Sequence, residues 1–331
     1  MTEIAAARFN EIISNLSGKK IAVVGDLMLD GYYWGEVKRI SPEAPVPVVE
    51  IDNEFFRFGG AANVVLNIKS LGATPVPFGI IGNDQEGKIF REEIAKENIT
   101  EKGIIVTNER PTTVKVRVIA NKQHIVRIDK EVKSNIDTNL EDELLNRIEA
   151  SISQLDAIVL QDYNKGVLTP RIISSVIKLA NANDCIVTVD PKFINFFNYE
   201  NVTVFKPNKK ETEDAFNIRI SNDSDIENAL FLLNEKLHAK NILLTLGEKG
   251  IALLDSDNNV TRVPTVARKV ADVSGAGDTV IATLTAAMTS GATFAEAAYL
   301  ANYAGGIVCE EMGIIPIDPQ KLLQQLNKDH N

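Results

Sequence analysis

Cysteine and histidine are scarce in this chain. Among its 331 residues only two are cysteine and three are histidine. Cys185 and Cys309 lie far apart in apolar stretches, and the histidines have no metal-ligand spacing to one another or to the cysteines. A disulfide framework, a zinc site and a histidine-dependent catalytic triad are therefore poorly supported, and the two cysteines suit a reducing compartment.

Long apolar runs and an excess of positive charge are also missing. The sequence has no run of about eighteen apolar residues, and its first residues lack the pattern of a signal peptide. With 35 lysines and arginines against 45 aspartates and glutamates, the net charge is −10. Such a balance disfavours nucleic acid and anionic membranes as partners. We therefore expect a cytoplasmic protein that binds phosphate only through local backbone N–H groups and a few lysines.

Short β-branched runs alternate with helical patterns along most of the chain. Continuous apolar strands separated by helices predict a mostly parallel sheet covered on both faces, which is a three-layer α/β/α fold. One domain over residues 1–331 is favoured over two in tandem. The predicted strands are 20–25, 157–161, 185–190, 202–205 and 241–246, and the predicted helices are 61–71, 87–97, 140–155, 170–182 and 226–237.

Two segments interrupt this alternation. Residues 32–58 contain three prolines among alternating apolar residues, and residues 112–129 alternate on both sides of a turn at 121–123. Alternation with a period of two around a turn predicts antiparallel hairpins. Periodicity alone leaves open whether they are ordinary edge strands or a small sheet that covers one edge of the domain.

A phosphate-binding P-loop is suggested by the first seven positions of Gly82-Asn-Asp-Gln-Glu-Gly-Lys88. Ile89, however, stands where a P-loop carries the Ser or Thr that binds magnesium. Asp84 and Glu86 also place negative charge in a loop that should hold phosphate. A helix-capping turn explains the same glycines and is the favoured interpretation.

The strongest chemical signal is the run Asp-Val-Ser-Gly-Ala-Gly-Asp-Thr at residues 272–279. Gly275, Ala276 and Gly277 form a small-residue turn that exposes backbone N–H groups at the start of a helical pattern, a ready anion site. Asp278 falls in the first turn, where an aspartate is most often a helix cap. A carboxylate beside an anion site is also what phosphoryl transfer to an alcohol requires.

Four motifs, in order, resemble those of the ribokinase-like sugar kinases, also called the phosphofructokinase-B family. The similarity spans essentially the whole chain. It implies an ATP- and Mg²⁺-dependent sugar kinase with a ribokinase-like fold and a small β lid. Besides residues 272–279, the motifs are Gly59-Gly-Ala-Ala-Asn63 with Gly82-x-Asp84-x-x-Gly87, Lys206-Pro-Asn208-x-x-Glu211, and Thr245-Leu-Gly247-x-x-Gly250.

Residues 25–30, 39–49 and 162–166 further resemble the members of this family that phosphorylate the C1 hydroxyl of a heptose 7-phosphate. Many of those are fused to a nucleotidyltransferase domain with a His-x-Gly-His motif, which this sequence lacks. The resemblance thus implies the kinase unit alone, as a homodimer joined through the lid strands. Two alternatives stay open: a kinase for another sugar or a nucleoside, and a sugar-sensing protein without catalysis.

The resemblance also implies roles for the motif residues. Asp278 would be the general base, and the amides of Gly275, Ala276 and Gly277 would hold the transferring phosphoryl group. Residues near ATP would be Asn208, Glu211, Thr245, Gly247, Gly250 and Asn302, with Glu211 bound to Mg²⁺ directly or through water. Residues near the sugar would be Asp30, Gly59, Gly60 and Asn63, and the cations that hold the 7-phosphate would come from Arg117, Arg127, Lys165 and Lys192.

Ordinary structural roles compete with several of these assignments. Without the resemblance, Glu211 is most simply a surface helix residue in a mixed charge run, and Asp30 a turn residue. Gly313-Ile-Ile-Pro316 also departs from the Gly-Thr-Ala common at this place in the family. A monovalent cation bound by neighbouring carbonyl groups is thus an open question.

Overall fold

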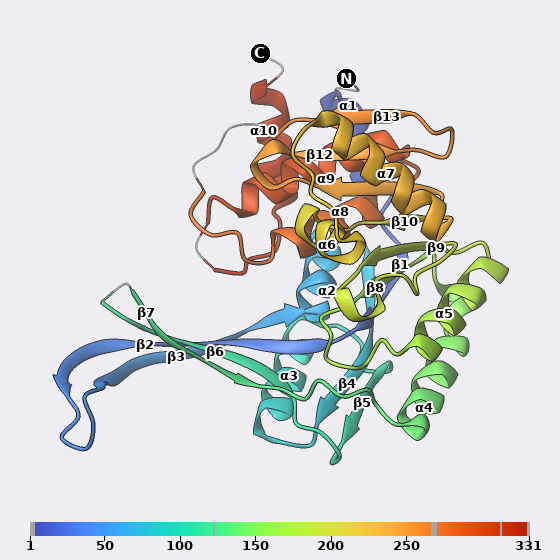
Figure 1. The fold of residues 1–331 in the computed structure, drawn as a ribbon. Coiled ribbons are helices and arrows are strands. Elements are labelled where there is room, and N and C mark those ends of the chain that lie inside the picture. Colours follow the sequence, from blue (N-terminus) through green and yellow to red (C-terminus); the bar gives the residue numbers. More distant parts are fainter. Residues whose placement is uncertain (1–3, 122, 266–269, 312, 330–331) are drawn as a thin grey trace.

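The computed structural model, which describes residues 4–121, 123–265, 270–311 and 313–329, contains a nine-stranded sheet (Figure 1). The strand order is β13-β12-β11-β10-β9-β8-β1-β4-β5. The seven strands from β11 to β5 run parallel, and β12 and β13 add an antiparallel edge. The strands are β1 (Lys20–Gly25), β4 (Thr74–Gly82), β5 (Ile104–Thr107), β8 (Ala157–Gln161), β9 (Ile186–Asp190), β10 (Val204–Phe205), β11 (Asn241–Thr245), β12 (Ile251–Leu254) and β13 (Val260–Val263).

Helices cover both faces of this sheet, so the predicted three-layer α/β fold is confirmed. Successive residues of a strand point to opposite faces. Ile21 and Val23 of β1 therefore belong to one apolar core, and Ala22 and Val24 to the other. The first core is packed by α1 (Ala6–Ser14), α2 (Ala61–Ser70), α3 (Gln85–Lys96), α8 (Ala276–Thr289), α9 (Phe294–Val308) and α10 (Pro319–Asp329), and the second by α4 (Thr138–Glu149), α5 (Pro170–Ala182), α6 (Lys209–Phe216) and α7 (Asp223–Leu237).

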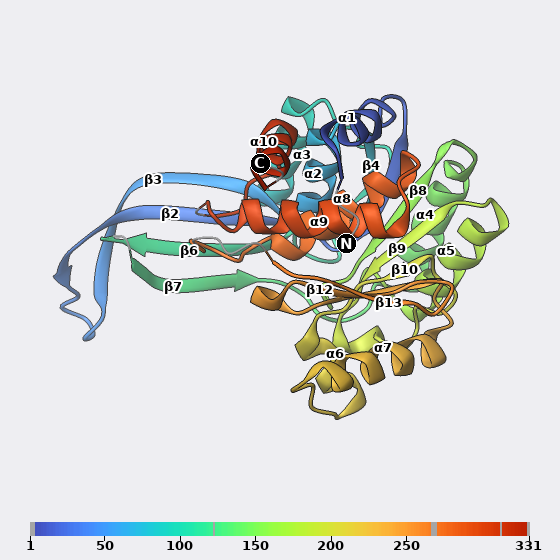
Figure 2. The ribbon, with the colours of Figure 1, turned by 90° about the horizontal axis from the view of Figure 1, so that it is seen from above.

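A second sheet extends from this body as a long arm (Figures 1 and 2). Its strands are β2 (Leu27–Ile40), β3 (Pro47–Gly60), β6 (Thr113–Ala120) and β7 (Gln123–Lys130), in the order β3-β2-β6-β7. Each predicted hairpin is present, and a parallel pairing of β2 with β6 joins the two. The predicted small lid sheet is thus confirmed, whereas edge strands of the main sheet are ruled out. Lys122, in the predicted turn, lies outside the described residues.

Local hydrogen bonds explain where the predicted strand boundaries were wrong. Strand β9 begins at Ile186 rather than 185, because Cys185 N bonds to Ala180 O and closes the end of α5. Strand β10 starts only at Val204, after Asn201 has made a left-handed turn with φ of 59°. Strand β11 ends at Thr245, because Leu246 N turns back to Gly250 O.

Helix boundaries differ from the prediction for similar reasons. The predicted helix 140–155 ends at Glu149, since a tighter 3₁₀ turn follows at Ile152–Gln154. Helix α3 starts at Gln85, because the Asp84 side chain accepts the N–H of Gly87. Residues 82–88 therefore form the capping turn rather than a P-loop. In the part of the chain that the structure describes, the helices are all too short or too polar to cross a bilayer.

Candidate active site

The carboxyl ends of the parallel strands bring polar side chains together beside the start of α8. Asp26 directly follows β1, Gln161 and Asp190 end β8 and β9, and Lys206 follows β10. All four side chains are buried. This edge of an open α/β sheet is where ligands commonly bind, because loops and helix N-termini gather there.

The glycine turn of residues 275–277 forms the N-terminus of α8. Gly275 is the N-cap residue, with φ of +79°, and a Cβ there would lie 2.9 Å from Asn63 Nδ2. Both the left-handed backbone and the close approach of Asn63 require glycine. The amides of Gly277 and Asp278 follow in the first helical turn, whose N–H groups have no acceptor within a helix. The predicted anion-binding turn therefore has the backbone geometry that this role needs.

Asp278 is 2% exposed, and side chains from other elements hold its carboxylate. Oδ1 accepts the hydroxyl of Tyr163 at 2.6 Å and Gln161 Nε2 at 3.1 Å, and Oδ2 accepts Asn63 Nδ2 at 2.8 Å. Burial raises the pKa of Asp278 to about 7, although the hydrogen bonds from Tyr163 and Asn63 lower it. The side chain thus points into a network that crosses the sheet, and it titrates in the range useful for a general base.

A buried ion pair lies under the glycine turn. Lys206 Nζ is 3.1 Å from Asp190 Oδ2, and a Cβ on Gly277 would lie 3.8 Å from that same nitrogen. Burial would raise the pKa of Asp190, but Lys206 and Lys192 outweigh it and hold the pKa below its ordinary value. Asp190 thus stays ionised beside Lys206. This ammonium group is in position to neutralise an anion bound at the turn.

Gln161 links this ion pair to Asp278. Its Nε2 donates to Asp190 Oδ2 at 3.2 Å as well as to Asp278 Oδ1. An ionised carboxylate only accepts hydrogen bonds, and the donor of a glutamine side chain is its amide nitrogen. Contact with two carboxylates therefore fixes the orientation of the Gln161 amide. The opposite atom, Oε1, is buried and has no hydrogen-bond partner among the described residues. Gln161 thus joins the two carboxylates through its nitrogen, while its oxygen accepts no hydrogen bond from the described residues.

The residues expected near the triphosphate meet at the start of α6. Asn208 and Glu211 form a reciprocal capping box, in which Glu211 Oε2 accepts the N–H of Asn208 at 2.9 Å. Glu211 Oε1 is paired with Lys192 Nζ. Burial opposes the charge of Lys192, but Asp190 and Glu211 more than compensate and raise its pKa. Glu211 is thus a partly buried, fully engaged side chain rather than a free surface residue.

Magnesium fits this arrangement only with help from phosphate or water. Among the described residues, no group of three or more His, Cys, Asp and Glu side chains could hold a metal ion. Both oxygens of Glu211 already accept a hydrogen bond or ion pair. Mg²⁺ commonly keeps several waters and binds one or two carboxylates together with substrate phosphates. Glu211 suits such a metal through its remaining lone pairs or through a bridging water.

The other residues expected near the nucleotide lie on the β11 side of the site. Thr245 is bridged to Asn208, so the structure brings these two together. Gly247 and Gly250 have φ of +63° and +86° in the turn that follows β11. Asn302 lies on α9, and its Nδ2 donates to Pro264 O at 3.0 Å, on the segment that leaves β13.

The residues expected near the sugar lie where β2 and β3 leave the main body. Asp30 is 3% exposed and forms an ion pair with Arg117. A Cβ on Gly59 would overlap with Asp30 Oδ2, and Gly60 has φ of +56° with Asp26 O 2.6 Å from the position of its Cβ. Asn63 follows on α2, and its amide donates to Asp278. The glycine pair thus allows backbone and carboxylate to share a narrow space.

Each cation expected at the 7-phosphate has a carboxylate partner. Arg117 pairs with Asp30, and Lys192 with Glu211. Lys165 Nζ lies 2.9 Å from Glu131, whose pKa falls to about 2 because Lys115 and Lys165 outweigh its burial. Arg127 is 59% exposed, faces Arg117 across β6 and β7, and pairs with Asp129 on its own strand. A phosphate would have to replace one of these carboxylate partners.

Five side chains of this site had no role in the prediction, although the sequence contains signals for them. Asp26, Tyr163 and Lys206 lie within quoted motifs, and Gln161 and Asp190 are the last residues of predicted strands. A polar residue at the carboxyl end of a buried parallel strand is a site candidate. That signal was available for Gln161 and Asp190, whereas the contact between Tyr163 and Asp278 has no counterpart in the sequence pattern.

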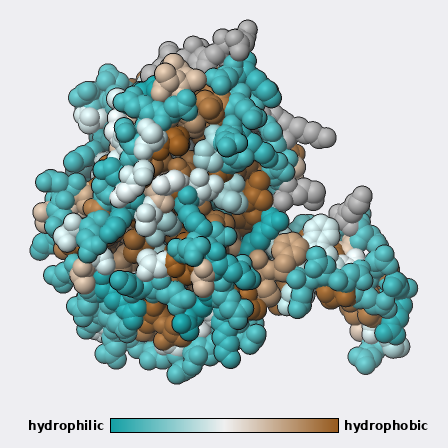
Figure 3. Space-filling view, turned by 180° about the vertical axis from the view of Figure 1, so that it is seen from behind, coloured by the Kyte–Doolittle hydropathy of each residue, from teal (hydrophilic) through white to brown (hydrophobic). Residues whose placement is uncertain are grey.

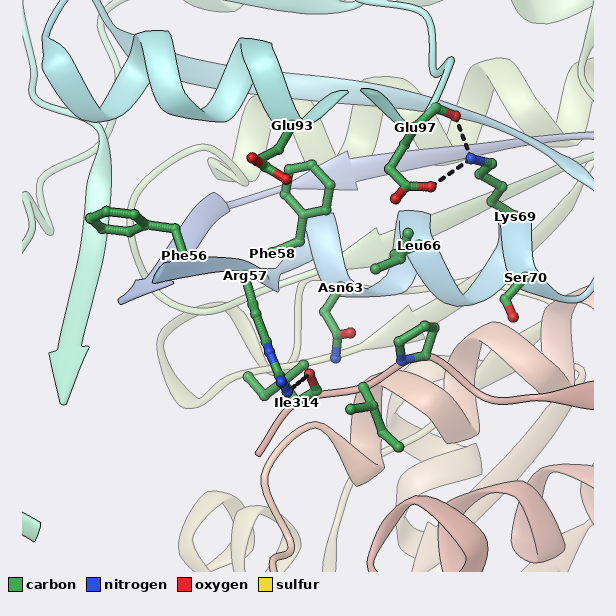
Figure 4. Close-up of a pocket in the computed structure, with 12 residues that line it drawn as sticks. Phe56, Arg57, Phe58, Asn63, Leu66, Lys69, Ser70, Glu93, Glu97 and Ile314 are labelled. Atoms are coloured by element: carbon green, nitrogen blue, oxygen red, sulfur yellow. Dashed lines mark hydrogen bonds and ion pairs between the residues drawn. The ribbon is translucent and has the colours of Figure 1, made fainter. Parts of the chain in front are cut away.

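A cavity of about 510 Å³ adjoins the sugar side of the site (Figure 4). It lies between β3, α2, α3 and the segment 314–316. Phe58 and Leu66 contribute apolar walls, and Glu93 lies at the α3 side. Arg57 crosses to the far wall and donates Nη1 to Ile314 O at 2.8 Å. The cavity therefore reaches the base of the lid as well as Asn63.

Comparisons with known proteins show what this chain is similar to. The model of the pfkB family of carbohydrate kinases matches residues 18–321. The bifunctional protein HldE of Helicobacter acinonychis is 39% identical over 312 residues, which are 94% of this chain and 67% of that protein. Two solved structures share the fold. Phosphofructokinase-2 of Escherichia coli in complex with potassium has a TM-score of 0.75 and 19% identity, and the match covers 93% of this chain and 99% of that one. Arabidopsis thaliana ribokinase with ribose and ATP has a TM-score of 0.72 and 20% identity, with coverages of 93% and 99%.

Proposed function

The chain belongs to the pfkB family of carbohydrate kinases, and from this premise we propose that it phosphorylates the C1 hydroxyl of D-glycero-β-D-manno-heptose 7-phosphate with ATP. ATP is the phosphoryl donor that kinases of this family use. The heptose is supported by the resemblance of residues 25–30, 39–49 and 162–166 to heptose 7-phosphate kinases, and by the 39% identity with HldE. The product would be the 1,7-bisphosphate, an intermediate on the route to ADP-heptose for lipopolysaccharide core.

The observation that carries this proposal is the position of Asp278 beside the glycine turn. Asp278 takes the proton as the O–H bond of the C1 hydroxyl breaks and the oxygen bonds to phosphorus. The bond from phosphorus to the leaving ADP oxygen breaks in the same transfer. The amides at Gly275–Gly277 and the ammonium group of Lys206 stabilise the charge on the phosphoryl group. A pKa of about 7 makes Asp278 a sufficiently strong base while leaving it largely ionised in mildly alkaline solution.

The remaining residues bind and orient the two substrates. Asn208, Thr245, Gly247, Gly250 and Asn302 border the nucleotide. Glu211 holds Mg²⁺ directly or through water, and the metal supplies further charge neutralisation on the phosphates. A monovalent cation is part of the proposal only as an activator to be tested, since potassium is present in one phosphofructokinase-2 structure.

The sugar is proposed to lie between the lid and α2. Asp30, Gly59, Gly60 and Asn63 contact its hydroxyl groups, since a carboxylate and an amide together accept and donate to a diol. Its 7-phosphate exchanges with a carboxylate at one of the paired cations, which are Arg117, Arg127, Lys165 and Lys192. Carboxylate and phosphate both suit a guanidinium group, so this exchange retains the ion pairing.

A second copy of this chain is the proposed partner of the lid. Strand β7 is exposed along its whole length, and Val126 and Ile128 are 50% and 52% exposed (Figure 3 shows apolar side chains along this arm). A long edge strand with exposed apolar residues is a template for pairing with another chain. Ile128→Asp should convert a dimer to monomer in sedimentation equilibrium, whereas Val106→Asp, also exposed but on β5, should not. A monomeric wild type would contradict the dimer.

The substrate panel is the decisive test of the function. ADP release is followed with heptose 7-phosphate, free heptose, ribose, fructose, fructose 6-phosphate and nucleosides. We expect the highest kcat/KM with the heptose phosphate. Preference for ribose, fructose or a nucleoside would replace the substrate while keeping the kinase. Sugar binding without any ATP turnover would instead favour a sugar-sensing protein.

A further inference from the structure

The motif of residues 162–166 forms a loop that two buried carboxylates hold in place. The Asp26 carboxylate accepts the N–H groups of Tyr163, Lys165 and Val167 at 2.9, 3.0 and 3.2 Å. Burial raises the pKa of Asp26 to about 6, with the neighbouring Asp162 as the next cause. Three backbone donors on one carboxylate fix three alternate residues of the loop at once.

The second carboxylate, Asp162, holds the same loop from within. It accepts the N–H of Asn164 at 2.7 Å and the hydroxyl of Tyr199 at 2.7 Å. Asn164 and Gly166 have φ of +54° and +85°, and a Cβ on Gly166 would overlap with Ser134 O. The backbone around Tyr163 therefore has little freedom to move.

This loop places the hydroxyl of Tyr163 against the proposed base. The hydroxyl lies 2.6 Å from Asp278 Oδ1, and Lys192 Nζ lies 5.7 Å from the centre of the same ring. Tyr163 is partly exposed. The ring thus stands between the cation paired with Glu211 and the carboxylate that takes the proton.

The hydrogen bonds of Asp278 differ between its two oxygens. Oδ1 accepts two donors, Tyr163 and Gln161, which is the ordinary capacity of a carboxylate oxygen. Oδ2 accepts Asn63 alone among the hydrogen bonds of the described residues and retains a lone pair. Asn63 belongs to α2, which begins directly after the Gly59–Gly60 pair proposed to approach the sugar. The acceptor position that remains is therefore on the sugar side.

We propose that Tyr163 is a positioning residue, which saturates Oδ1 of Asp278 so that the C1 hydroxyl of the sugar delivers its proton to Oδ2. The inference rests on the function proposed above, in which Asp278 is the base. In this step the O–H bond of the sugar breaks, its proton bonds to Oδ2, and Tyr163 keeps its own proton. Burial and the charge of Asp278 raise the pKa of Tyr163 well above its ordinary value, which keeps the hydroxyl a donor.

The charged groups around Asp278 are unaffected by removal of the Tyr163 hydroxyl. Asp190 on β9 raises the pKa of Asp278, and Lys206 after β10 lowers it. Lys192 interacts with Asp278 from the loop after β9, and Asp30 on β2 acts on Tyr163. Replacement of Tyr163 by phenylalanine therefore removes one neutral hydrogen-bond donor from Asp278 and leaves the charged residues around it in place.

The test compares Tyr163→Phe with Tyr299→Phe as a matched control. Tyr299 is buried, and its hydroxyl donates to Tyr303 on α9 rather than to a carboxylate. The pKa of Asp278 is measured by NMR on protein labelled with ¹³C-aspartate, without sugar or ATP, and Asp278→Asn assigns the signal. We expect Tyr163→Phe to raise this pKa by about one unit, because a donor to the charged form is lost. Tyr299→Phe should leave it unchanged.

The pH dependence of kcat provides a second measurement. The acid limb of the kcat profile should move to higher pH by the same amount in Tyr163→Phe. This gives about a five-fold loss at pH 7 and little loss above pH 9, with the KM for sugar nearly constant. An unmoved pKa and acid limb would overturn the proposal, as would a loss of kcat by one factor at every pH.

Two further outcomes can be distinguished: a Tyr163→Phe variant that does not fold, and a wild type that phosphorylates no sugar. If Tyr163→Phe does not fold, 3-fluorotyrosine incorporated at the six tyrosines makes the hydroxyl a stronger donor, and the pKa of Asp278 should then fall. A pKa of Asp278 that does not fall in that protein would contradict the inference. If the wild type phosphorylates no sugar of the panel, the proposed function fails, whereas the NMR titration still reports whether Tyr163 controls Asp278.

Discussion

Lys206 Nζ lies 3.1 Å from Asp190 Oδ2, and both side chains are almost completely buried under the glycine turn of α8. Removing one partner of a buried ion pair leaves an uncompensated charge, which costs about 3–5 kcal/mol. The pair therefore links the stability of the fold to the proposed stabilisation of the phosphoryl group.

This relationship predicts different effects of single and double substitution. Lys206→Met should lower the free energy of unfolding by about 3–5 kcal/mol and reduce kcat by at least about a hundred-fold. Adding Asp190→Asn should restore most of the stability but not the turnover. Denaturant unfolding and ADP release are measured on both proteins. Equal recovery of stability and kcat in the double variant would contradict a direct role of the Lys206 charge.

Asp278→Asn should retain the fold and bind ATP while losing about a thousand-fold or more in turnover, because an amide does not accept the proton. ADP release measures turnover, and calorimetric titration with ATP measures binding. Asp255→Asn is the matched control, since Asp255 lies in the exposed turn between β12 and β13. Near-normal turnover of Asp278→Asn would exclude Asp278 as the base.

The pKa of about 7 for Asp278 has consequences in two directions. Activity should rise as the pH increases through about 7, because the base must be ionised. The free energy of unfolding should fall as the pH increases, because the native state binds the proton of the Asp278 carboxyl more tightly than the unfolded chain does. The contribution of Asp278 is therefore most favourable below about pH 4 and is lost between about pH 4 and 7.

Asp26, with a pKa of about 6, acts in the same direction as Asp278. Because of these two groups, the free energy of unfolding of the wild type should fall by a few kcal/mol from pH 4 to pH 8. The free energy of unfolding of Asp278→Asn should fall less over the same range. Denaturant titrations at a series of pH values measure both curves. Parallel curves for wild type and Asp278→Asn would show that the carboxyl is not perturbed by burial.

Gly59→Ala should weaken sugar binding without changing ATP binding. A Cβ at Gly59 overlaps with Asp30 Oδ2, so the carboxylate must leave its place beside Arg117. We expect the KM for the sugar to rise about ten-fold or more, with an unchanged KM for ATP. Gly31→Ala is the control, because the atoms nearest to its Cβ are side-chain carbons of Phe56 and Val116. An equal rise in both variants would point to a general effect on β2.

The sequence was sufficient to predict five of the nine strands of the main sheet, the two hairpins and the glycine turn, since these depend on local periodicity and turn residues. The parallel pairing of β2 with β6 joins segments about eighty residues apart, and no local pattern encodes it. The contact between Tyr163 and Asp278 was unpredictable for the same reason, because it depends on the way Asp26 fixes a distant loop. Lys206 belonged to a quoted motif, but its partner Asp190 became evident only when β9 and β10 were adjacent.

The lid is continuous with the body at both ends of its first hairpin. Only Asp26 separates β1 from β2, and α2 begins at Ala61 directly after β3 ends at Gly60. An arm attached in this way cannot turn as a separate module on a linker, so it must bend within its own strands. The register shifts at Trp34/Gly35 and Val37/Arg39 are the places where β2 already departs from regular pairing. Changes of arm length are correspondingly tolerable at the tip, residues 41–46, whereas one inserted residue at the base would displace Asp30 and Gly59 together.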